Sequence, residues 1–337
     1  MYLQNKKSKK AFDLPFSWIF AIIAGSVIII ISIYATVKFV GVGKTYDYSM
    51  SAQTIANILD EAVSGLASTS IISPIQFRKE TRIYLDCEVY FPTSPVFGRQ
   101  TIAFSEESGF IQKWASPGMN ISRYNKYIFG EKLMQSKKYL IFSKPFYSGF
   151  KVDDLVYIIP TTKDYCFIGA PEEIQKNILS FNFENLNNSE SITKCKENSL
   201  KVCFDFNSQE CNIIVSYDNS DNFGSGTILK DNQRLSYFNE GLLYAGIFSS
   251  PEIYDCNIER LGNKINVLGQ VYKDKIELLS GKECGSLISP SIDLIIDISK
   301  NLTSEKLGDI YQEAKTMDRL NCNSACPIYG AENCLGL

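Results

Sequence analysis

The side chains that carry out most enzymatic chemistry are scarce in this chain, and histidine is missing altogether. Without an imidazole, the chain itself cannot build a Ser-His-Asp or Cys-His nucleophile, an H-E-x-x-H zinc site or a His-ligated haem. The phosphate-binding motifs G-x-x-x-x-G-K-[ST] and G-x-G-x-x-G and the hydrolase motif G-x-S-x-G do not occur either. Catalysis would therefore need paired carboxylates, a Ser-Lys dyad or a bound metal.

Two pairs of neighbouring residues come closest to such chemistry. Asp153-Asp154 lies in a predicted strand, where successive side chains point to opposite faces and do not share a site. Ser143-Lys144 has its two residues adjacent, whereas a dyad of the S-x-x-K type places both on one face of a helix. We therefore expect no catalytic residues, no cofactor, no metal site and no enzyme activity.

Cysteine is the reactive residue that the chain does use, and all ten cysteines follow an apolar segment near the N-terminus. An even number confined to one side of such a segment predicts up to five disulfides in an oxidising compartment. No C-x-x-C redox motif is present. The candidate disulfide cysteines are Cys87, Cys166, Cys195, Cys203, Cys211, Cys256, Cys284, Cys322, Cys326 and Cys334.

One cysteine pair has a local argument for its pairing. Cys203 and Cys211 lie in two strand-like segments that flank the turn-like stretch 207–210, which predicts a disulfide across a β-hairpin. Cys322, Cys326 and Cys334 crowd the C-terminus, where a bridge to the main body would hold the tail in place. A Cys-only zinc site is the alternative there, but the spacing does not match the paired C-x2-C of zinc ribbons.

The chain also carries three N-x-[ST] triplets, at Asn120, Asn187 and Asn301. These are candidate glycosylation acceptors if the region lies outside the cell.

The distribution of charge bears on nucleic acid as a partner. Five lysines and one aspartate precede Lys44, and the rest of the chain has 29 basic and 36 acidic residues. A mildly acidic bulk does not form the phosphate-binding surface that nucleic acid requires, so we expect no nucleic-acid partner.

The elements that position these residues follow from periodicity. Helical spacing indicates a helix over Ser51–Ala67, and short runs rich in Ile, Val, Tyr and Phe then predict strands. These runs are Thr81–Tyr90, Gln100–Phe104, Lys138–Phe142, Asp154–Ile159, Asp164–Ile168, Lys201–Phe206, Asn212–Tyr217 and Gly226–Leu229. The strands before Ile168 are expected to form an antiparallel sheet. A short helix is predicted to begin at Pro171-Glu172, and the polar stretch Phe181–Ser191 is predicted to be an exposed loop.

After Tyr237 the pattern is mostly helical. The longest helix begins at Ser250-Pro251-Glu252 and carries an apolar stripe with alternating spacings of three and four residues, as in a coiled coil. A helix packed on its own domain is the preferred interpretation, since Cys256 lies beside the stripe. The alternative is a seam between the copies of a homo-oligomer. A further helix is predicted over Ser304–Leu320.

The N-terminal region has the length and composition of a membrane span. The 24 residues Leu14–Val37 contain no charge. At 1.5 Å per residue they reach about 36 Å, which exceeds a hydrocarbon core about 30 Å thick. A cleavable signal peptide has a shorter apolar region and a small-x-small cleavage site, so an uncleaved signal anchor is favoured.

The lysines predict which way this anchor points. Four lysines precede the span and two, Lys38 and Lys44, follow it closely. By the positive-inside rule the N-terminus stays in the cytoplasm and everything after the span lies outside the cell. The expected division is a cytoplasmic basic tail at 1–13, a transmembrane helix at 14–40 that contacts the lipid bilayer, and an extracytoplasmic domain at 41–337.

Several segments resemble a group of uncharacterised single-pass membrane proteins of small-genome archaea. They are Lys10–Gly25, Asn125–Phe129, Phe142–Phe146, Lys151–Leu155 and Tyr254–Arg260. The resemblance implies a surface-facing domain on a membrane anchor and brings no catalytic residues. A weaker likeness is to type IV pilins, which also have a basic leader, an apolar helix and a β-rich head. Archaeal pilin leaders commonly end in a basic residue and Gly, whereas this chain has Lys10-Ala11.

These observations predict an α+β protein with an N-terminal transmembrane helix. An antiparallel β-rich region and a helical C-terminal region would follow in one disulfide-stapled ectodomain. Its expected function is non-enzymatic: it binds a partner, most simply a protein at the cell surface, or contributes to the cell envelope. A pilin-like filament subunit and a His-free extracytoplasmic enzyme are the alternatives.

Overall fold

The computed structural model describes residues 16–36, 38, 71–89, 97–107, 114–118, 120–205, 209–217, 224–279 and 287–322; of residues 71–73 and 322 it describes the backbone alone. The chain divides into two compact units, Met1–Asp47 and Tyr48–Leu337. The first unit contains one described helix, Phe16–Thr36. The predicted helix over Ser51–Ala67 lies outside the described residues.

The helix Phe16–Thr36 is long and apolar enough to cross a membrane, and none of its most apolar stretch is buried inside the structure. Large side chains such as Trp18, Ile28 and Tyr34 expose 64%, 64% and 65% of their surface. In a water-soluble protein so wide an apolar surface would be covered by other parts of the fold. The chain therefore has a single candidate membrane anchor or signal segment among its described residues.

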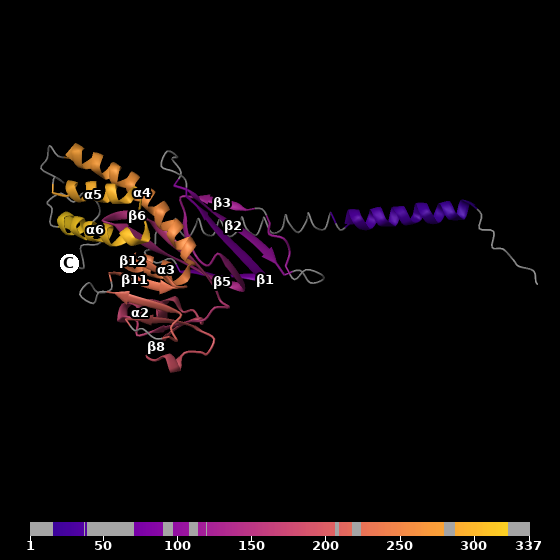
Figure 1. The fold of residues 1–337 in the computed structure, drawn as a ribbon, viewed down its shortest axis with the longest axis horizontal. Helices are drawn as coiled ribbons and strands as arrows, with labels where there is room; N and C mark the ends of the chain where they lie inside the picture. Colours follow the sequence, from indigo (N-terminus) through magenta and orange to yellow (C-terminus); the bar gives the residue numbers. More distant parts are fainter. Residues whose placement is uncertain are drawn as a thin grey trace, which may run out of the picture. The chain divides into compact units, whose positions relative to one another are not determined.

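The second unit is an α+β body built on two six-stranded sheets (Figure 1). The first sheet has the order β3-β2-β1-β5-β6-β4 and the second has the order β12-β11-β10-β9-β7-β8. The first contains β1 (Ile71–Glu88), β2 (Arg99–Glu106), β3 (Ile121–Tyr124), β4 (Tyr127–Phe129), β5 (Leu133–Ser148) and β6 (Phe150–Pro160). The second contains β7 (Tyr165–Ile168), β8 (Leu186–Ser189), β9 (Leu200–Phe204), β10 (Ile213–Tyr217), β11 (Ser225–Lys230) and β12 (Gln233–Phe238).

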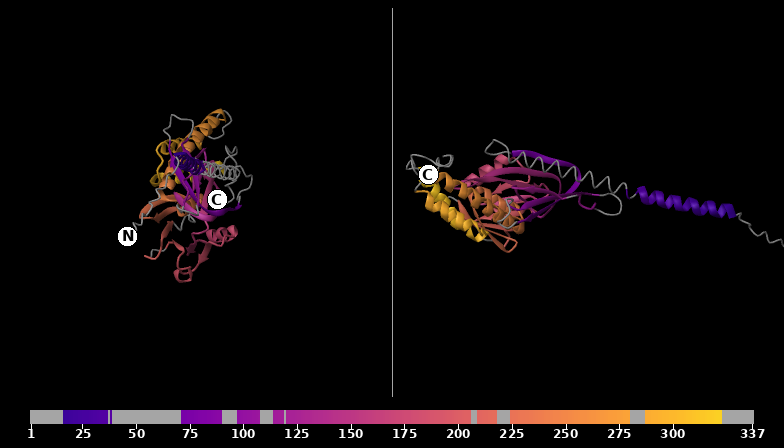
Figure 2. Two further views of the ribbon diagram at one scale, coloured as in Figure 1. Left: turned by 90° about the vertical axis from the view of Figure 1, so that its right-hand side faces the viewer. Right: turned by 90° about the horizontal axis from the view of Figure 1, so that it is seen from above.

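Among the described residues of the body, the helices that accompany the sheets are α2 (Glu172–Phe181), α3 (Asn239–Phe248), α4 (Pro251–Leu279), α5 (Ser289–Ser299) and α6 (Leu307–Cys322). The short 3-10 turn η1 (Ile192–Lys194) precedes β9, and η4 (Ser304–Lys306) precedes α6. Helices α4, α5 and α6 gather on one flank of the strands, and α2 lies beside β8 at another (Figures 1 and 2). The predicted helical C-terminal region is thus confirmed, although no local pattern in the sequence predicted α5 as a separate helix.

Helix α3 forms the centre of the body because it packs against strands of both sheets: β5 and β6 of the first, and β11 and β12 of the second. All of its residues from Gly241 to Phe248 are buried. The helix approaches β11 so closely at Gly246 that a Cβ there would clash with the Ile228 side chain. A helix that is apolar on every side is the expected occupant of such a position between two layers.

The sheets are mixed, so the predicted antiparallel region is only partly correct. Strands β1, β2, β3, β5 and β6 pair antiparallel, but β4 pairs parallel with β6. The predicted strand Asp164–Ile168 is β7, which belongs to the second sheet and pairs parallel with β8 and β9. The physical reason is the connection: α2 carries the chain from β7 back to the start of β8, and a helical crossover joins parallel neighbours.

Two further expectations are wrong in detail. The predicted loop Phe181–Ser191 contains β8, an edge strand whose polar side chains gave no alternation of apolar and polar residues to detect. The predicted β-hairpin around Cys203 and Cys211 is instead a pair of parallel strands, β9 and β10. Strand propensity locates both strands correctly, but it carries no information on their relative direction.

The long helix α4 supports the preferred interpretation of its stripe. Tyr254, Ile258, Leu261, Ile265 and Ile276 are all buried in the main core of the body. The helix packs along α5 and also contacts β1, β4 and β6. The stripe therefore covers the chain's own sheets and helices.

Candidate functional site

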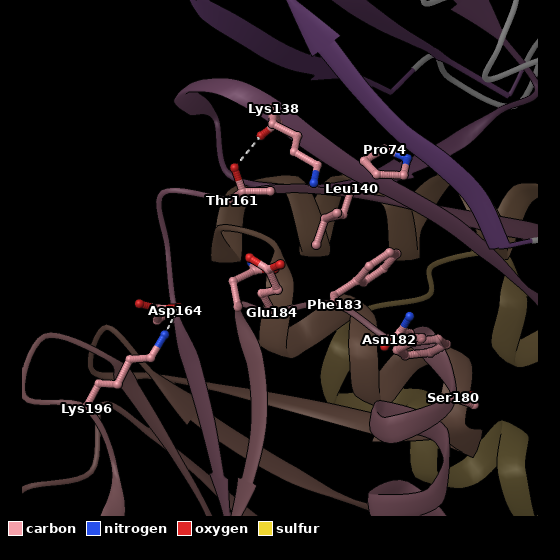
Figure 3. Close-up of a pocket in the computed structure, with 12 residues that line it drawn as sticks. Pro74, Lys138, Leu140, Thr161, Asp164, Ser180, Asn182, Phe183, Glu184 and Lys196 are labelled. Carbon is pink, nitrogen blue, oxygen red and sulfur yellow. Dashed lines mark hydrogen bonds and ion pairs between the residues drawn. The ribbon is translucent and has the colours of Figure 1, made fainter.

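Among the described residues, a cavity of about 650 Å³ lies at the junction of the two sheets (Figure 3). Its walls come from β1 and β5 of the first sheet, the turn between β6 and β7, the end of α2 and the turn into β8. The described residues that line it are Pro74, Lys138, Leu140, Thr161, Asp164, Ser180, Phe181, Asn182, Phe183, Glu184, Asn185 and Lys196. We call this site the junction cavity.

The end of α2 shapes one wall of the junction cavity. Asn182 caps the helix with a left-handed backbone (φ 52°), and its N–H donates to the Leu179 carbonyl. Asn is one of the few residues that adopt this conformation readily, and the turn that follows places Phe183 beside Phe181 with ring centroids 6.2 Å apart. An aromatic surface therefore stands next to the polar groups of the cavity.

The opposite wall is held by hydrogen bonds between strand ends. The Thr161 hydroxyl donates to the Lys138 carbonyl at 3.0 Å, and Asn185 Nδ2 donates to the Lys163 carbonyl at the same distance. Asn185 is 5% exposed, so its amide is part of the buried frame. These bonds bring the turn after β6 and the turn before β8 together as one rigid edge.

Charges of both signs surround the opening. Lys196 Nζ lies 3.1 Å from Asp164 Oδ1, and these side chains expose 62% and 34% of their surface. Lys138 and Glu184 are exposed on the same rim. An exposed pair of this kind contributes little to stability, because water and salt screen it. Its charges remain available to a ligand.

This combination points to ligands with many hydroxyl groups. Carboxylate, amide and hydroxyl side chains donate and accept hydrogen bonds in fixed directions, while an aromatic ring packs against an apolar face. A cavity of this size can also hold a drug-sized molecule. Sequence reasoning missed this site because its residues come from five separate segments, and because the Asn-rich stretch after α2 has the composition of an ordinary loop.

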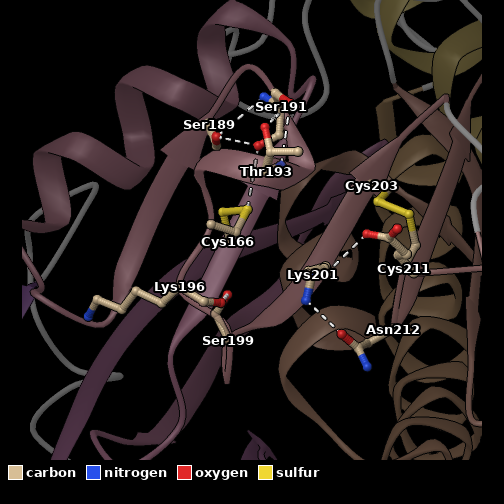
Figure 4. A network of polar contacts seen from close by, with 12 residues as sticks. Cys166, Ser189, Ser191, Thr193, Lys196, Ser199, Lys201, Cys203, Cys211 and Asn212 are labelled. Carbon is tan, nitrogen blue, oxygen red and sulfur yellow. Dashed lines mark hydrogen bonds and ion pairs between the residues drawn. A yellow bond between two sulfur atoms is a disulfide. The ribbon is translucent and has the colours of Figure 1, made fainter.

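The predicted cysteine sites can be placed individually. Six of the ten cysteines form three disulfides: Cys87–Cys256, Cys166–Cys195 and Cys203–Cys211. The first joins β1 to α4, across 169 residues of sequence. The other two lie on one face of the second sheet (Figure 4). Cys166 and Cys203 pack there with Ile168. Cys284, Cys326 and Cys334 lie outside the described residues, as does the side chain of Cys322.

Polar contacts also lie next to the two disulfides of the second sheet (Figure 4). Ser191 caps η1 by accepting from the Thr193 N–H, and the Lys201 N–H donates to Asn212 Oδ1 at 2.9 Å. Cys203–Cys211 closes the eight-residue connection that returns the chain from β9 to the parallel strand β10. A parallel connection usually takes a dozen residues or more, so this short return is held by a covalent link as well as by hydrogen bonds.

The remaining predicted residues differ in exposure: the acceptor asparagines lie on the surface, the acidic doublet is only partly exposed, and the pair Ser143-Lys144 is buried on β5. The side chains of Asn120, Asn187 and Asn301 are all exposed, as a glycosylation acceptor must be. Asp153 pairs with Lys264, whereas Asp154 pairs with Lys151, so the acidic doublet is divided between two partners. No group of three or more His, Cys, Asp or Glu residues able to hold a metal occurs in the described part of the chain. The zinc alternative for the C-terminal cysteines falls outside that part.

A second cavity, of about 580 Å³, lies beside the Cys87–Cys256 disulfide. Asp255, Glu259 and Glu305 contribute three carboxyl groups to its lining. The pKa of Asp255 is raised, chiefly because the group is partly buried, while a hydrogen bond with Ser304 acts in the opposite direction.

Comparisons with protein-family models, curated proteins and solved structures find no match to this chain.

Proposed function

We propose that this chain is a single-pass, membrane-anchored extracytoplasmic binding protein. The observation that carries the proposal is the pairing of an apolar helix, Phe16–Thr36, with three disulfides that all lie beyond it in the sequence. Disulfides persist in oxidising compartments and are rare in the cytosol. The helix supplies the anchor, and the cross-linked body is the part that meets a partner outside the cell.

The lysines support one orientation of this anchor. Lys6, Lys7, Lys9 and Lys10 precede the helix within ten residues of its start. Positive residues of this kind are retained on the cytoplasmic side, which leaves the body outside. The helix then acts as an uncleaved signal anchor.

Binding is assigned to the junction cavity, and its ligand to the class of oligosaccharides. Phe183 offers an apolar ring for the flat face of a sugar, and Asp164, Asn182 and Glu184 surround it with groups that bond hydroxyls. Mixed charge at the rim favours a neutral, hydroxyl-rich ligand over a strongly charged one. A protein that displays such glycans, or that docks elsewhere on the body, would be the surface partner.

The topology is tested by labelling thiols on intact cells with a membrane-impermeant maleimide. We expect the body to be labelled only after an added reductant opens its disulfides, without permeabilising the membrane. A Ser8→Cys variant is the matched control, since its thiol should be labelled only after permeabilisation. If the native cysteines react without reductant and only in permeabilised cells, the proposed location is wrong.

The ligand is tested by applying the full chain, purified in detergent, to a glycan array. Binding should be lost in a Phe183→Ala variant, because the ring that packs on the sugar is removed. Tyr124→Ala is the control: Tyr124 is an aromatic residue that is 48% exposed, but it lies on β3 and does not line the junction cavity. Binding that both variants retain would contradict this assignment of the cavity.

An extracytoplasmic enzyme is the second candidate function, and the carboxyl-lined cavity beside Cys87–Cys256 favours it. Burial raises the pKa of Asp255, and a shift in this direction favours the protonated form that a general acid requires. The test is hydrolysis of glycans by the wild type and by Asp255→Asn. Turnover that the variant loses would establish the enzyme, whereas binding without turnover would favour the binding protein.

A further inference from the structure

Three side chains from separate elements meet inside the body, where the first sheet, α2 and α3 join. Lys144 lies on β5, Asn177 on α2 and Glu240 in the first turn of α3. Lys144 Nζ lies 2.9 Å from Glu240 Oε2, and Asn177 Nδ2 donates a short hydrogen bond to Glu240 Oε1. One carboxyl group therefore holds a primary amine and a carboxamide side by side.

The surroundings of this triad are aromatic, and Lys144 is its most buried member, whereas the Glu240 side chain is 24% exposed. Lys144 is 8% exposed, and its amine lies 5.8 Å from the centre of the Phe181 ring and 5.9 Å from that of Tyr244. Phe142 extends this cluster, with its ring centroid 4.6 Å from that of Phe181. Among partly buried aromatic side chains, charges interact more strongly than they do in water.

The influence of Glu240 reaches the buried phenols around it. The pKa values of Tyr157 and Tyr244 are both raised well above 10, mainly by burial and next by the charge of the Glu240 carboxylate. The carboxyl group thus acts through a medium that screens it weakly.

Two other lysines with low exposure have a different environment. Lys230 directs its amine at Glu131 and at the carbonyls of Ile247 and Ser249. Lys264 pairs with Asp153. Neither set of partners includes a carboxamide, so the Lys144 site is the one among these three that brings an amine and an amide to the same carboxyl group.

We propose that Lys144 and Asn177 are joined by an intramolecular isopeptide bond and that Glu240 catalyses its formation. The Lys144 ammonium first passes a proton to the Glu240 carboxylate. The lone pair of the neutral Nζ then attacks Cγ of Asn177, and the Cγ–Nδ2 bond breaks. Glu240 gives its proton to the departing Nδ2 and takes one from Nζ, so one ammonia leaves and no oxidant or other reactant is required.

Positioning alone can account for much of the rate. An amine and an amide held together by a folded body react as parts of one molecule, which removes the entropic cost of bringing them together. Glu240 adds acid–base catalysis because each of its oxygens already contacts one of the reacting groups. The same reaction is not expected in the unfolded chain, where these three residues are separated.

The bond would complete the covalent framework of the body. Among the described cysteines, Cys87–Cys256 joins the first sheet to α4, and the other two disulfides lie within the second sheet and its connections. A link from β5 to α2 would tie the first sheet directly to the crossover helix of the second. It would also resist reduction, which the disulfides do not.

The experiment is an intact-mass measurement on the full chain, purified in detergent, fully reduced and denatured. We expect the wild type to weigh less than its sequence by one ammonia, and proteolysis to give a branched peptide that joins Lys144 to Asn177. A mass equal to that of the sequence overturns the proposal. Ammonia loss that maps to any other pair of residues overturns it as well.

Variants separate the role of each group, with circular dichroism to verify folding. Glu240→Gln keeps the hydrogen-bonding shape but cannot exchange a proton as a carboxyl group does, so its mass should match the sequence. Asn177→Asp should lose one water in place of ammonia. Asp153→Asn, at the Lys264 pair, is the matched control and should still lack one ammonia. If folded Glu240→Gln contains the bond as fully as the wild type, the catalytic assignment is wrong.

Discussion

The two sheets of the body are stabilised in different ways. The first is built around three long strands, of 18 residues in β1, 16 in β5 and 11 in β6, and its two short strands, β3 and β4, lie at its edges. It has buried apolar side chains on both of its faces. The second has strands of four to six residues. Its inner face joins the main core, while its other face has a small apolar cluster and two disulfides.

This difference shows what short strands require. Hydrophobic stabilisation grows with the apolar area removed from water, and a strand of four residues buries little of it. A disulfide stabilises by restricting the unfolded chain, so its contribution does not depend on the area of the sheet. We infer that burial dominates in the first sheet, and that covalent links supply a large share in the second.

The largest expected effect is on the first sheet, at Phe142. Its fully buried ring packs against Tyr157, Phe181, Tyr244 and Phe248. Replacing it with Ala should lower the free energy of unfolding by about 4 kcal/mol, because a cavity is left in the shared core. Urea unfolding followed by circular dichroism measures this. A loss below about 1 kcal/mol would mean that burial is not what holds the first sheet.

Removing Cys166–Cys195 should have a slightly smaller effect, and a local one. The bond closes a loop of 29 residues, which by chain entropy corresponds to about 3.5 kcal/mol in a Cys166→Ser, Cys195→Ser variant. Hydrogen exchange should then accelerate in β7 and β8 more than in β5 and β6. The control is the Cys203→Ser, Cys211→Ser variant, whose eight-residue loop predicts a smaller loss, of about 2.5 kcal/mol. Equal acceleration in both sheets would break the comparison.

Two buried tyrosines, one in each sheet, allow a finer comparison, because their effects on the free energy of unfolding should differ by about 1 kcal/mol. The Tyr139 hydroxyl, in the first sheet, donates to the Thr81 carbonyl at 2.6 Å, whereas the Tyr165 hydroxyl, in the second, has no hydrogen-bond partner in the structure described. Tyr139→Phe should therefore cost about 1 kcal/mol at neutral pH, and Tyr165→Phe almost nothing. Urea unfolding of both variants at pH 7 checks this, and equal losses would contradict it.

The same tyrosines predict a loss of stability in alkali. Burial raises the pKa values of Tyr139 and Tyr165 above the ordinary value of 10.0. In the unfolded chain these tyrosines lose their protons near pH 10, while in the folded body they retain them. Their contribution to the free energy of unfolding is therefore complete below pH 10 and falls above it. Above pH 10, each tyrosine should lower the free energy of unfolding by roughly 1.4 kcal/mol for each pH unit. In either Tyr→Phe variant the free energy of unfolding should fall less steeply with pH, which urea unfolding from pH 9 to 11 would measure.

The smallest expected effect is at the rim of the junction cavity. Lys196→Ala removes the exposed ion pair with Asp164 and should change the free energy of unfolding by less than about 1 kcal/mol. Thermal unfolding at low and high salt measures it. A larger loss would show that the pair holds the two sheets together, and that the rim is more than a ligand-facing surface.

Local patterns in the sequence were sufficient for most individual elements. The uncharged run around Ile28, the helix that begins at Pro171-Glu172 and the apolar stripe of α4 were all identified, because each is a property of a few consecutive turns of chain. Strand β8 was missed, since its polar residues do not alternate. The pairing of Cys203 with Cys211 was predicted, but the direction of their strands was not.

The sequence by itself determined that the chain has an apolar helix, an α+β body and no imidazole chemistry. Only the tertiary structure decided that β7 belongs to the second sheet, that Cys87 is bonded to Cys256 across 169 residues, and that there is a junction cavity. It alone brought Lys144, Asn177 and Glu240 to one point. The reason is that the periodicity of the sequence indicates only which face of a single element is buried. A site depends on which distant elements pack together, and this is determined by the packing of the whole core.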